Sequence, residues 1–232
     1  MKECIVLAGG LGTRLQSVVK DVPKCMADIS GKPFLYYLLK YLEKEQFEHI
    51  VLSLGYKHEI VTDWISKNEF TFPISYIIEE KPLGTGGAIR FAQTKINSPH
   101  FFIINGDTFF DVDTNAIVLF HQREKSDISI ALKPMTNFDR YGSVTLKENK
   151  IISFNEKQFC ESGLINGGIY LINKNIFSDL SLPEVFSFEK EILEKKITEL
   201  YINGMIQNKY FIDIGIPEDY IKANNDFPTL NL

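Results

Sequence analysis

A glycine-rich segment near the amino terminus, together with two basic side chains, suits a phosphate ligand. The apolar segment 4–7 is typical of a buried strand and runs directly into segment 8–14, Ala-Gly-Gly-Leu-Gly-Thr-Arg. A strand that stops at glycines before a helical pattern lets backbone N–H groups approach an anion without interference from a β-carbon. Arg14 adds a planar, permanently charged guanidinium, and Lys24 follows ten residues later. The glycine spacing fits neither GxGxxG nor GxxxxGK(S/T), and a tight strand-to-helix turn without a ligand is the alternative.

Two aspartates in apolar surroundings could hold a divalent cation. Asp107 follows the apolar segment 101–104, and Asp213 lies within the apolar segment 210–214. A carboxylate in such a segment is costly to bury unless it is paired or binds a metal. Two carboxylates together with substrate phosphates are a usual arrangement for Mg²⁺. On spacing alone, a salt bridge or a helix cap explains these two residues equally well.

Segment 7–14, together with Pro-Lys-Cys-Met at 23–26, resembles the signature of the sugar-phosphate nucleotidylyltransferases, usually written GGxGTRL…PKPM. Members of this family join a nucleoside triphosphate to a sugar 1-phosphate and release pyrophosphate. Cys25 stands where the family usually has proline. Because that proline is a rigid spacer rather than a reacting group, Lys24 is expected to keep its role. The resemblance implies Mg²⁺ as cofactor.

The resemblance also implies a role for each residue that matches a family motif. Arg14, Lys24 and Asp107 would be catalytic, and Asp107 and Asp213 would bind Mg²⁺. The nucleotide-binding residues would be Leu7, Ala8, Gly9, Gly10, Gly12, Thr13, Glu79, Glu80, Gly84, Thr85 and Gly106. The sugar-binding residues would be Gly142, Glu156, Lys157, Asn166 and Gly167, with Lys157 on the sugar phosphate and Glu156 on the hydroxyls.

Segment 79–87 resembles the base-reading segment of the family, and its first residue bears on the choice of nucleotide. A carboxylate only accepts hydrogen bonds, and guanine presents two adjacent donors. Uridylyl- and thymidylyltransferases commonly place glutamine here, because a pyrimidine edge offers both a donor and an acceptor. Glu79 therefore favours GTP over UTP or dTTP, with Glu80 as the neighbouring candidate.

Four segments, 18–24, 106–113, 164–168 and 210–220, narrow the resemblance to the guanylyltransferases that use D-glycero-α-D-manno-heptose 1-phosphate. That activity would supply GDP-heptose for bacterial surface polysaccharide. A mannose 1-phosphate guanylyltransferase, or a transferase that uses UTP or dTTP, is the alternative within the family. A catalytically silent relative that binds nucleotide-sugars is the alternative outside enzymes. A glycosyltransferase would need an Asp-x-Asp metal motif, and Asp-Val-Asp at 111–113 is instead interpreted as a helix-capping pair.

Strands and helices that alternate in the first half of the chain would position these residues. Strands are expected at 49–54, 74–78 and 101–104, with one helix that starts at 31–33 and others at 59–67 and 84–96. This alternation indicates a Rossmann-like α/β fold: a mixed, mostly parallel sheet flanked by helices, with ligands at the carboxyl ends of the strands. From about residue 127, short strand-like segments predict an antiparallel excursion that carries the sugar pocket. We expect one domain, 1–232, with a nucleotide-binding part at about 1–125 and a sugar-binding part at about 126–232.

The composition is that of an ordinary soluble globular protein of 232 residues, with 44% hydrophobic residues and a net charge of −5. The acidic balance and the lack of a basic run argue against a nucleic-acid partner. No apolar run approaches a membrane span, and too few residues precede the first strand for a signal peptide. Three widely spaced cysteines argue against a disulfide framework. A cytoplasmic location is expected, and a homodimer is left open.

Overall fold

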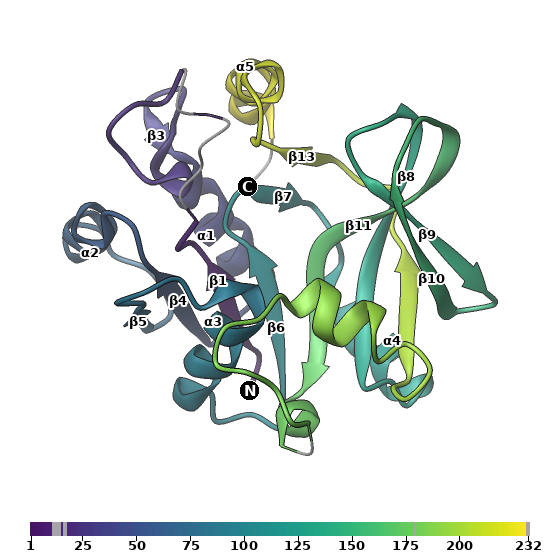
Figure 1. Ribbon diagram of the computed structural model, residues 1–232. Coiled ribbons are helices and arrows are strands. Elements are labelled where there is room, and N and C mark those ends of the chain that lie inside the picture. The colour runs from purple at the N-terminus through teal and green to yellow at the C-terminus, as the bar shows by residue number, and fades with distance from the viewer. Residues whose placement is uncertain (11–14, 16–17, 179, 231–232) are drawn as a thin grey trace.

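In the part of the chain that the computed structural model describes, which is residues 1–232 without 11–14, 16–17, 179 and 231–232, nine strands form one mixed sheet. Their order is β5-β4-β1-β6-β11-β8-β12-β10-β9 (Figure 1). Two short two-stranded sheets accompany it. The α/β class with a mixed sheet, predicted from the alternation of elements, is confirmed.

The first half of the sheet is parallel and consists of β1 (Glu3–Leu7), β4 (His49–Leu54), β5 (Ile74–Ile78) and β6 (His100–Asn105). β1 lies between β4 and β6, and β4 also pairs with β5. The carboxyl ends of these strands therefore meet at one edge of the sheet. The glycine segment, Glu79 and Asp107 follow the strands at this edge, as the sequence predicted.

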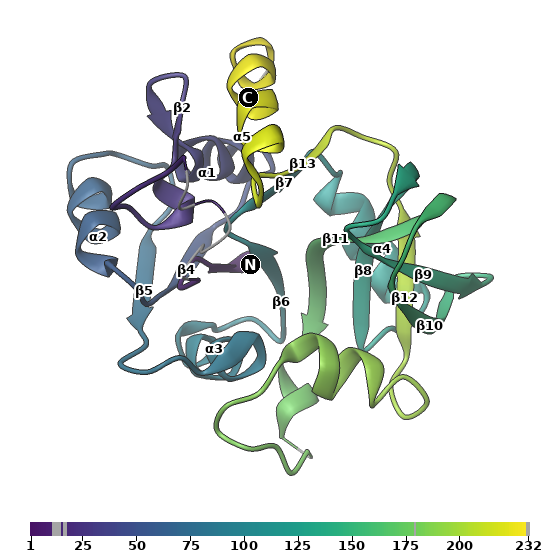
Figure 2. The ribbon, with the colours of Figure 1, turned by 45° about the horizontal axis from the view of Figure 1, so that its top comes forward.

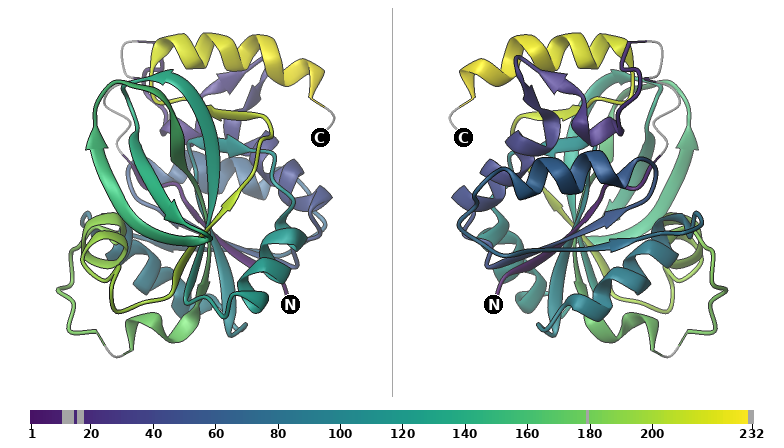
Figure 3. Two further views of the ribbon diagram at one scale, coloured as in Figure 1. Left: turned by 90° about the vertical axis from the view of Figure 1, so that its right-hand side faces the viewer. Right: turned by 90° about the vertical axis from the view of Figure 1, so that its left-hand side faces the viewer.

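The second half contains β8 (Ile128–Phe138), β9 (Gly142–Lys147), β10 (Lys150–Lys157), β11 (Cys160–Asn173) and β12 (Ile202–Ile206). β11 runs antiparallel to both β6 and β8 and so joins the two halves of the sheet. The predicted antiparallel excursion is present, and in Figure 3 its teal and green strands rise toward the yellow helix α5. β12, which the sequence analysis did not anticipate, pairs parallel with β8.

Helices cover both faces of the parallel half: α1 (Phe34–Lys44), α2 (His58–Ser66) and α3 (Gly84–Ala92). α4 (Thr114–Arg123) and α5 (Pro217–Asp226) complete the α-helices of the described residues. Figure 2 shows α1 and α3 on opposite sides of β1 and β4. The predicted apolar stripe of α1 is confirmed, because its members are all fully buried: Phe34, Leu35, Leu38, Leu39 and Leu42.

Alternation along β1 explains the two apolar cores. Cys4 and Val6 point to one face and belong to the cluster that includes α1, whereas Ile5 belongs to the cluster that includes α3. Successive side chains of a strand point to opposite faces, and the residues of β1 after Glu3 are all apolar because both faces of this strand are covered. No helix of the described residues is long and apolar enough to cross a membrane.

The short elements place polar residues near the edge of the sheet. β7 (Thr108–Phe110) pairs antiparallel with β13 (Phe211–Asp213), so that Asp213 lies opposite Thr108. β2 (Asp28–Ile29) and β3 (Lys32–Pro33) form a small hairpin, so the helix expected to start at 31–33 begins only at Phe34. Short helices in the described part of the chain include 3₁₀ helices at Lys24–Met26, Gln93–Lys95, Lys174–Phe177 and Phe227–Thr229, and a π-helix at Glu189–Glu194.

Candidate active site

A cavity of about 670 Å³ lies at the carboxyl ends of β1, β4, β5 and β6. The predicted residues that line it are Leu7, Gly9, Gly10, Glu79, Glu80, Gly84, Thr85 and Asp107. Four loops that are distant in sequence therefore converge on one space, which is where an open α/β sheet binds its ligand. The positions of these residues at the ends of expected parallel strands predict this convergence without the family resemblance.

Other predicted nucleotide residues lie next to this cavity or outside the described part of the chain. Ala8 is buried, and its N–H donates to the Ser53 carbonyl at 2.9 Å. The N–H of Gly106 donates to the Leu7 carbonyl at 2.9 Å and so ties the end of β6 to the end of β1. The predicted nucleotide residues Gly12 and Thr13 and the predicted catalytic Arg14 lie outside the described residues.

Lys24 connects the two predicted metal ligands. Its ammonium lies 2.6 Å from Asp107 Oδ2 and 3.4 Å from Asp213 Oδ1. The pairing of β7 with β13 brings Asp213 to this place, and the N–H of Ile214 donates to the backbone carbonyl of Asp107 at 3.0 Å. The structure therefore joins three residues that are separated by 83 and 189 positions in sequence.

The electrostatics of this cluster reflect two carboxylates that share one cation. Burial raises the pKa of Asp213, the negative charge of Asp107 raises it further, and Lys24 opposes both effects. An additional positive charge would stabilise the ionised pair. Carboxylate oxygens are suitable ligands for Mg²⁺. Among the described residues no group of three or more His, Cys, Asp or Glu could hold a metal ion, so further ligands would have to come from a bound substrate or water.

Both oxygens of Glu79 are held at the side of the cavity. The Ser53 hydroxyl donates to Oε1 at 3.1 Å, and the Leu83 N–H donates to Oε2 at 3.0 Å. Each carboxylate oxygen has more than one acceptor position, so Glu79 can still accept hydrogen bonds from a ligand. Glu80 also lines the cavity and is exposed, so both candidates for reading the base remain in place.

Glu189 lines the same cavity, although the sequence analysis did not single it out. Its Oε2 accepts hydrogen bonds from the hydroxyls of Thr85 at 2.6 Å and Ser187 at 2.8 Å. No local motif marks Glu189, because its relation to Thr85 is made across 104 positions. Ser53 and Asn105 also line the cavity, and each carried a usable signal as a polar residue near the end of an apolar strand.

The predicted sugar residues lie on the antiparallel half. Gly142 pairs with Lys157 across β9 and β10, and the side chains of Glu156 and Lys157 are exposed. Asn166 and Gly167 lie on β11 at a bulge, since β11 uses more residues than β8 between the pairs Asn166–Leu132 and Tyr170–Ile130. Bulges often redirect side chains next to active sites. Among the described residues, these five predicted sugar residues lie outside the lining of the 670 Å³ cavity.

A smaller cavity of about 350 Å³ links the carboxylate cluster to the segment before Gly142. Asp213, Arg140 and Tyr141 all line it. Arg140 donates to Asp219 at 2.5 Å and to the Tyr141 hydroxyl at 2.7 Å. Burial, followed by the charge of Asp213, raises the pKa of Tyr141 to about 12, so this hydroxyl stays protonated at neutral pH.

The family model for nucleotidyl transferases matches residues 3–229 of this chain. The chain belongs to the nucleotidyl transferase family. This nucleotidyl transferase is 47% identical over 224 residues to the D-glycero-alpha-D-manno-heptose 1-phosphate guanylyltransferase of Aneurinibacillus thermoaerophilus, with 97% of each chain covered. It is also 47% identical over 219 residues to the protein of that name from Campylobacter jejuni, with 94% of this chain and 96% of that one covered.

Solved structures agree with this membership. The crystal structure of HddC from Yersinia pseudotuberculosis matches this nucleotidyl transferase with a TM-score of 0.90 and 41% identity, covering 98% of this chain and 100% of that one. HddC in complex with GMP-PN matches with a TM-score of 0.88. The family and the fold predicted from the motifs are therefore confirmed.

Proposed function

We propose that this nucleotidyl transferase moves GMP from GTP to D-glycero-α-D-manno-heptose 1-phosphate and releases pyrophosphate. The observation that carries the reaction class is the Lys24–Asp107–Asp213 cluster at a cavity lined by the glycine segment. The two relatives named above, each covered almost end to end at 47% identity, support the heptose. Glu79, which presents only acceptors to the cavity, supports guanine as the base.

The reaction needs no covalent intermediate on the protein. A phosphate oxygen of the sugar 1-phosphate attacks the α-phosphorus of GTP, and the bond from that phosphorus to the pyrophosphate oxygen breaks in line. A phosphate monoester is already ionised at neutral pH, so a general base is scarcely needed. The chain's contribution is positioning and neutralisation of charge. In this proposal Lys24 and Arg14 hold phosphate oxygens, and Glu79 or Glu80 reads the base.

Mg²⁺ fits the carboxylate pair in chemistry and in number of ligands. Asp107 and Asp213 each direct one oxygen at the same cation, the Lys24 ammonium, and so lie close enough together to share a metal ion. The phosphates of GTP would supply further oxygen ligands. When bound, Mg²⁺ would neutralise the negative charge that develops on the phosphate oxygens. Asp107 and Asp213 are thus the proposed metal ligands.

We assign nucleotide binding to about residues 1–125 and sugar binding to about 126–232 of a single domain. On the nucleotide side, the contacts come from Leu7, Ala8, Gly9, Gly10, Gly12, Thr13, Gly84, Thr85 and Gly106. On the sugar side, Lys157 would bind the phosphate, Glu156 the hydroxyls, and Gly142, Asn166 and Gly167 the ring. The product would serve bacterial surface polysaccharide synthesis in the cytoplasm, where nucleoside triphosphates are available. Glu189 is an exception to this division, because it belongs by number to the sugar-binding part but lines the 670 Å³ cavity assigned to the nucleotide.

The test is pyrophosphate release in the presence of Mg²⁺, with GTP, ATP, UTP and dTTP each combined with heptose, mannose and glucose 1-phosphates. We expect the highest kcat/KM for GTP with the heptose. Preference for mannose 1-phosphate would show that the proposed sugar substrate is wrong. Preference for UTP or dTTP would show that Glu79 does not select guanine. No release with any pair would favour a silent nucleotide-sugar-binding protein.

A matched pair of variants tests the assignment of the carboxylates. Asp107→Asn should abolish turnover, because it removes a charge from the cluster with Lys24 and Asp213. Asp111→Asn makes the same chemical change a few residues further on, after β7, and should leave turnover intact. If only Asp111→Asn abolished turnover, the metal assignment would be wrong.

A further inference from the structure

A cation of the protein already lies between the two proposed metal ligands. The ammonium of Lys24 contacts Asp107 Oδ2 at 2.6 Å and Asp213 Oδ1 at 3.4 Å. The Lys24 side chain is only 12% exposed, which is less than either carboxylate. A metal ion that bridged these two oxygens would have to take the place of this ammonium.

The surroundings hold both carboxylates toward Lys24. The other oxygen of Asp107, Oδ1, accepts a hydrogen bond from the Thr108 hydroxyl at 3.2 Å. The Asp213 carboxylate accepts one from the backbone N–H of Gly215. Gly215 also closes this side of the cluster: a β-carbon there would lie 2.9 Å from Asp213 Oδ1 and 3.3 Å from Lys24 Nζ. The position between the carboxylates is therefore a shared one that admits a single cation.

We propose that Lys24 occupies the metal position in the ligand-free protein, and that Mg²⁺ enters fully only when the phosphates of the nucleotide draw the ammonium away. This inference rests on the proposed function. Mg²⁺ binds oxygen ligands at about 2.1 Å, so an ion bridging the pair would be in direct repulsion with an ammonium in its present place. Lysine suits such a displacement, because its charge sits at the end of a flexible four-carbon chain and phosphate oxygens are equally good partners.

The thermodynamic consequence is that metal and nucleotide bind cooperatively. Without phosphate, a divalent ion must displace Lys24 and leave the ammonium without its carboxylate partners. With phosphate, that cost is removed, and by linkage the metal strengthens nucleotide binding by the same factor. In this proposal Lys24 therefore has two partners in succession, first the Asp107–Asp213 pair and then the triphosphate.

The test measures binding of Mn²⁺ alone, as a probe for the divalent ion, by the loss of the free-ion signal in electron paramagnetic resonance. The full-length wild type is compared with Lys24→Met, without nucleotide or sugar. We expect Lys24→Met to bind Mn²⁺ about tenfold more tightly, because the competing cation is gone. Lys67→Met is the control, since it removes the same charge from an exposed ion pair with Asp63 at the end of α2 and should not change Mn²⁺ affinity.

Equal or weaker Mn²⁺ binding by Lys24→Met would overturn the proposal, as would an equal gain in Lys67→Met. Lys24→Gln, which keeps a polar side chain, provides the same comparison if Lys24→Met does not fold. Pyrophosphate release by the wild type separates this inference about Lys24 from the proposed transferase reaction. Turnover without tighter Mn²⁺ binding in the variant would overturn this inference alone, and tighter binding without turnover in the wild type would overturn the proposed reaction alone.

Discussion

Gly9 lies directly against the carboxylate of Glu79: a β-carbon on Gly9 would come within 2.9 Å of Glu79 Oε1 and 3.3 Å of the Gly55 nitrogen. The segments that follow β1, β4 and β5 therefore meet with no room for a methyl group.

We expect Gly9→Ala to lower the free energy of unfolding by about 1–3 kcal/mol, the usual cost of overpacking. Gly10→Ala is the matched control, because a β-carbon there meets no other described atom within 4 Å. Urea unfolding without ligand measures both variants. Equal losses in the two would show that the contact with Glu79 is not the cause.

Glu79→Gln tests how the base is chosen. The glutamine can keep both internal contacts, because its carbonyl can accept from the Leu83 N–H and its amide can donate to Ser53. It loses one acceptor, so kcat/KM for GTP should fall by roughly tenfold to a hundredfold, the worth of a hydrogen bond to a charged group. The ratio of GTP to UTP turnover measures the effect. Glu80→Gln is the matched variant. A larger loss of kcat/KM for GTP in Glu80→Gln than in Glu79→Gln would assign recognition of the base to Glu80.

Tyr170 positions a predicted sugar residue. Its buried hydroxyl accepts a hydrogen bond from Asn166 Nδ2 at 2.9 Å, while the Gly168 N–H donates to Asn166 Oδ1. We expect Tyr170→Phe to raise KM for the sugar phosphate several-fold and to leave KM for GTP unchanged. Tyr210→Phe removes a comparable hydroxyl, one that donates to Asp226 on α5, and should change neither constant. A change in KM for GTP alone in Tyr170→Phe would contradict this role.

Cys25 should be chemically inert despite its place beside Lys24. The residue is 2% exposed, and burial, followed by the charge of Asp107, raises the pKa of its thiol to about 12. Only the thiolate reacts, so labelling with iodoacetamide at pH 8 should be far slower in the folded protein than after unfolding. Mass spectrometry should find Cys160, which is partly exposed, labelled first. If Cys25 were labelled as fast as Cys160, the 3₁₀ helix Lys24–Met26 would open in the folded protein, and the predicted inertness of Cys25 would be wrong.

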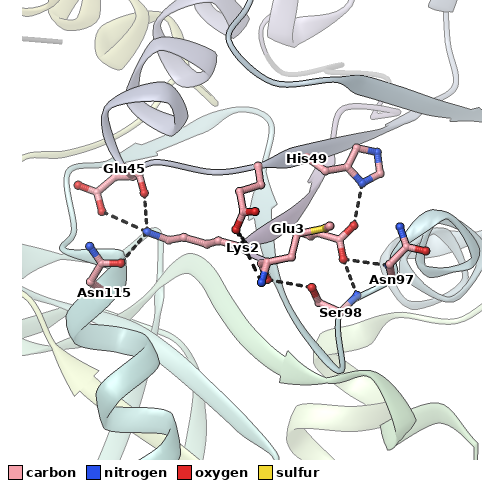
Figure 4. A network of polar contacts seen from close by, with 9 residues as sticks. Lys2, Glu3, Glu45, His49, Asn97, Ser98 and Asn115 are labelled. Atoms are coloured by element: carbon pink, nitrogen blue, oxygen red, sulfur yellow. Dashed lines mark hydrogen bonds and ion pairs between the residues drawn. The ribbon is translucent and has the colours of Figure 1, made fainter.

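At the opposite end of β1, Glu3 is a fully buried carboxylate in a polar network (Figure 4). Its Oε1 lies 2.8 Å from His49 Nδ1, and its Oε2 accepts from the N–H groups of Asn97 at 2.9 Å and Ser98 at 2.5 Å. Burial acts to raise the pKa of Glu3, but the hydrogen bonds from His49, Ser98 and Asn97 outweigh it, and the pKa is lowered. The ionised form therefore stabilises the fold.

The lowered pKa predicts how stability depends on pH. The contribution of Glu3 is fully present above the pKa of an unfolded glutamate, about 4.3, and is lost as the pH falls through the lower folded value. Glu3→Gln should cost about 1–3 kcal/mol at pH 7 and flatten the loss of stability below about pH 5. Thermal unfolding from pH 3 to 7 measures this. Glu48→Gln, at an exposed carboxylate, should retain the wild-type slope.

Local pattern was sufficient for the elements that carry the nucleotide half. The strands at 49–54 and 74–78 match the structure residue for residue, because apolar runs and following glycines or charges mark their ends. Asp113 caps α4 by accepting a hydrogen bond from the Ala116 N–H, so the interpretation of 111–113 as a capping pair is confirmed for Asp113. What sequence reasoning missed depends on long-range pairing. β12 contains a glycine, and its partner strand β8 lies 74 positions earlier in the sequence. Glu189 lines the cavity, and its contact with Thr85 spans 104 positions.

The bulge in β11 packs the segment that carries two predicted sugar residues against the end of the parallel half of the sheet. Asn166 and Gly167 lie where the ladder with β8 is interrupted, whereas the pairs on either side, Ile165–Lys133 and Leu171–Ser129, keep β11 in register. The bulge itself is closely packed, because a β-carbon on Gly167 would lie 2.5 Å from the Phe110 ring and one on Gly168 would lie 2.8 Å from Asn105 Nδ2. Since Asn105 also lines the 670 Å³ cavity, an exchange at Gly168 is expected to disturb that cavity together with the predicted sugar residues beside it.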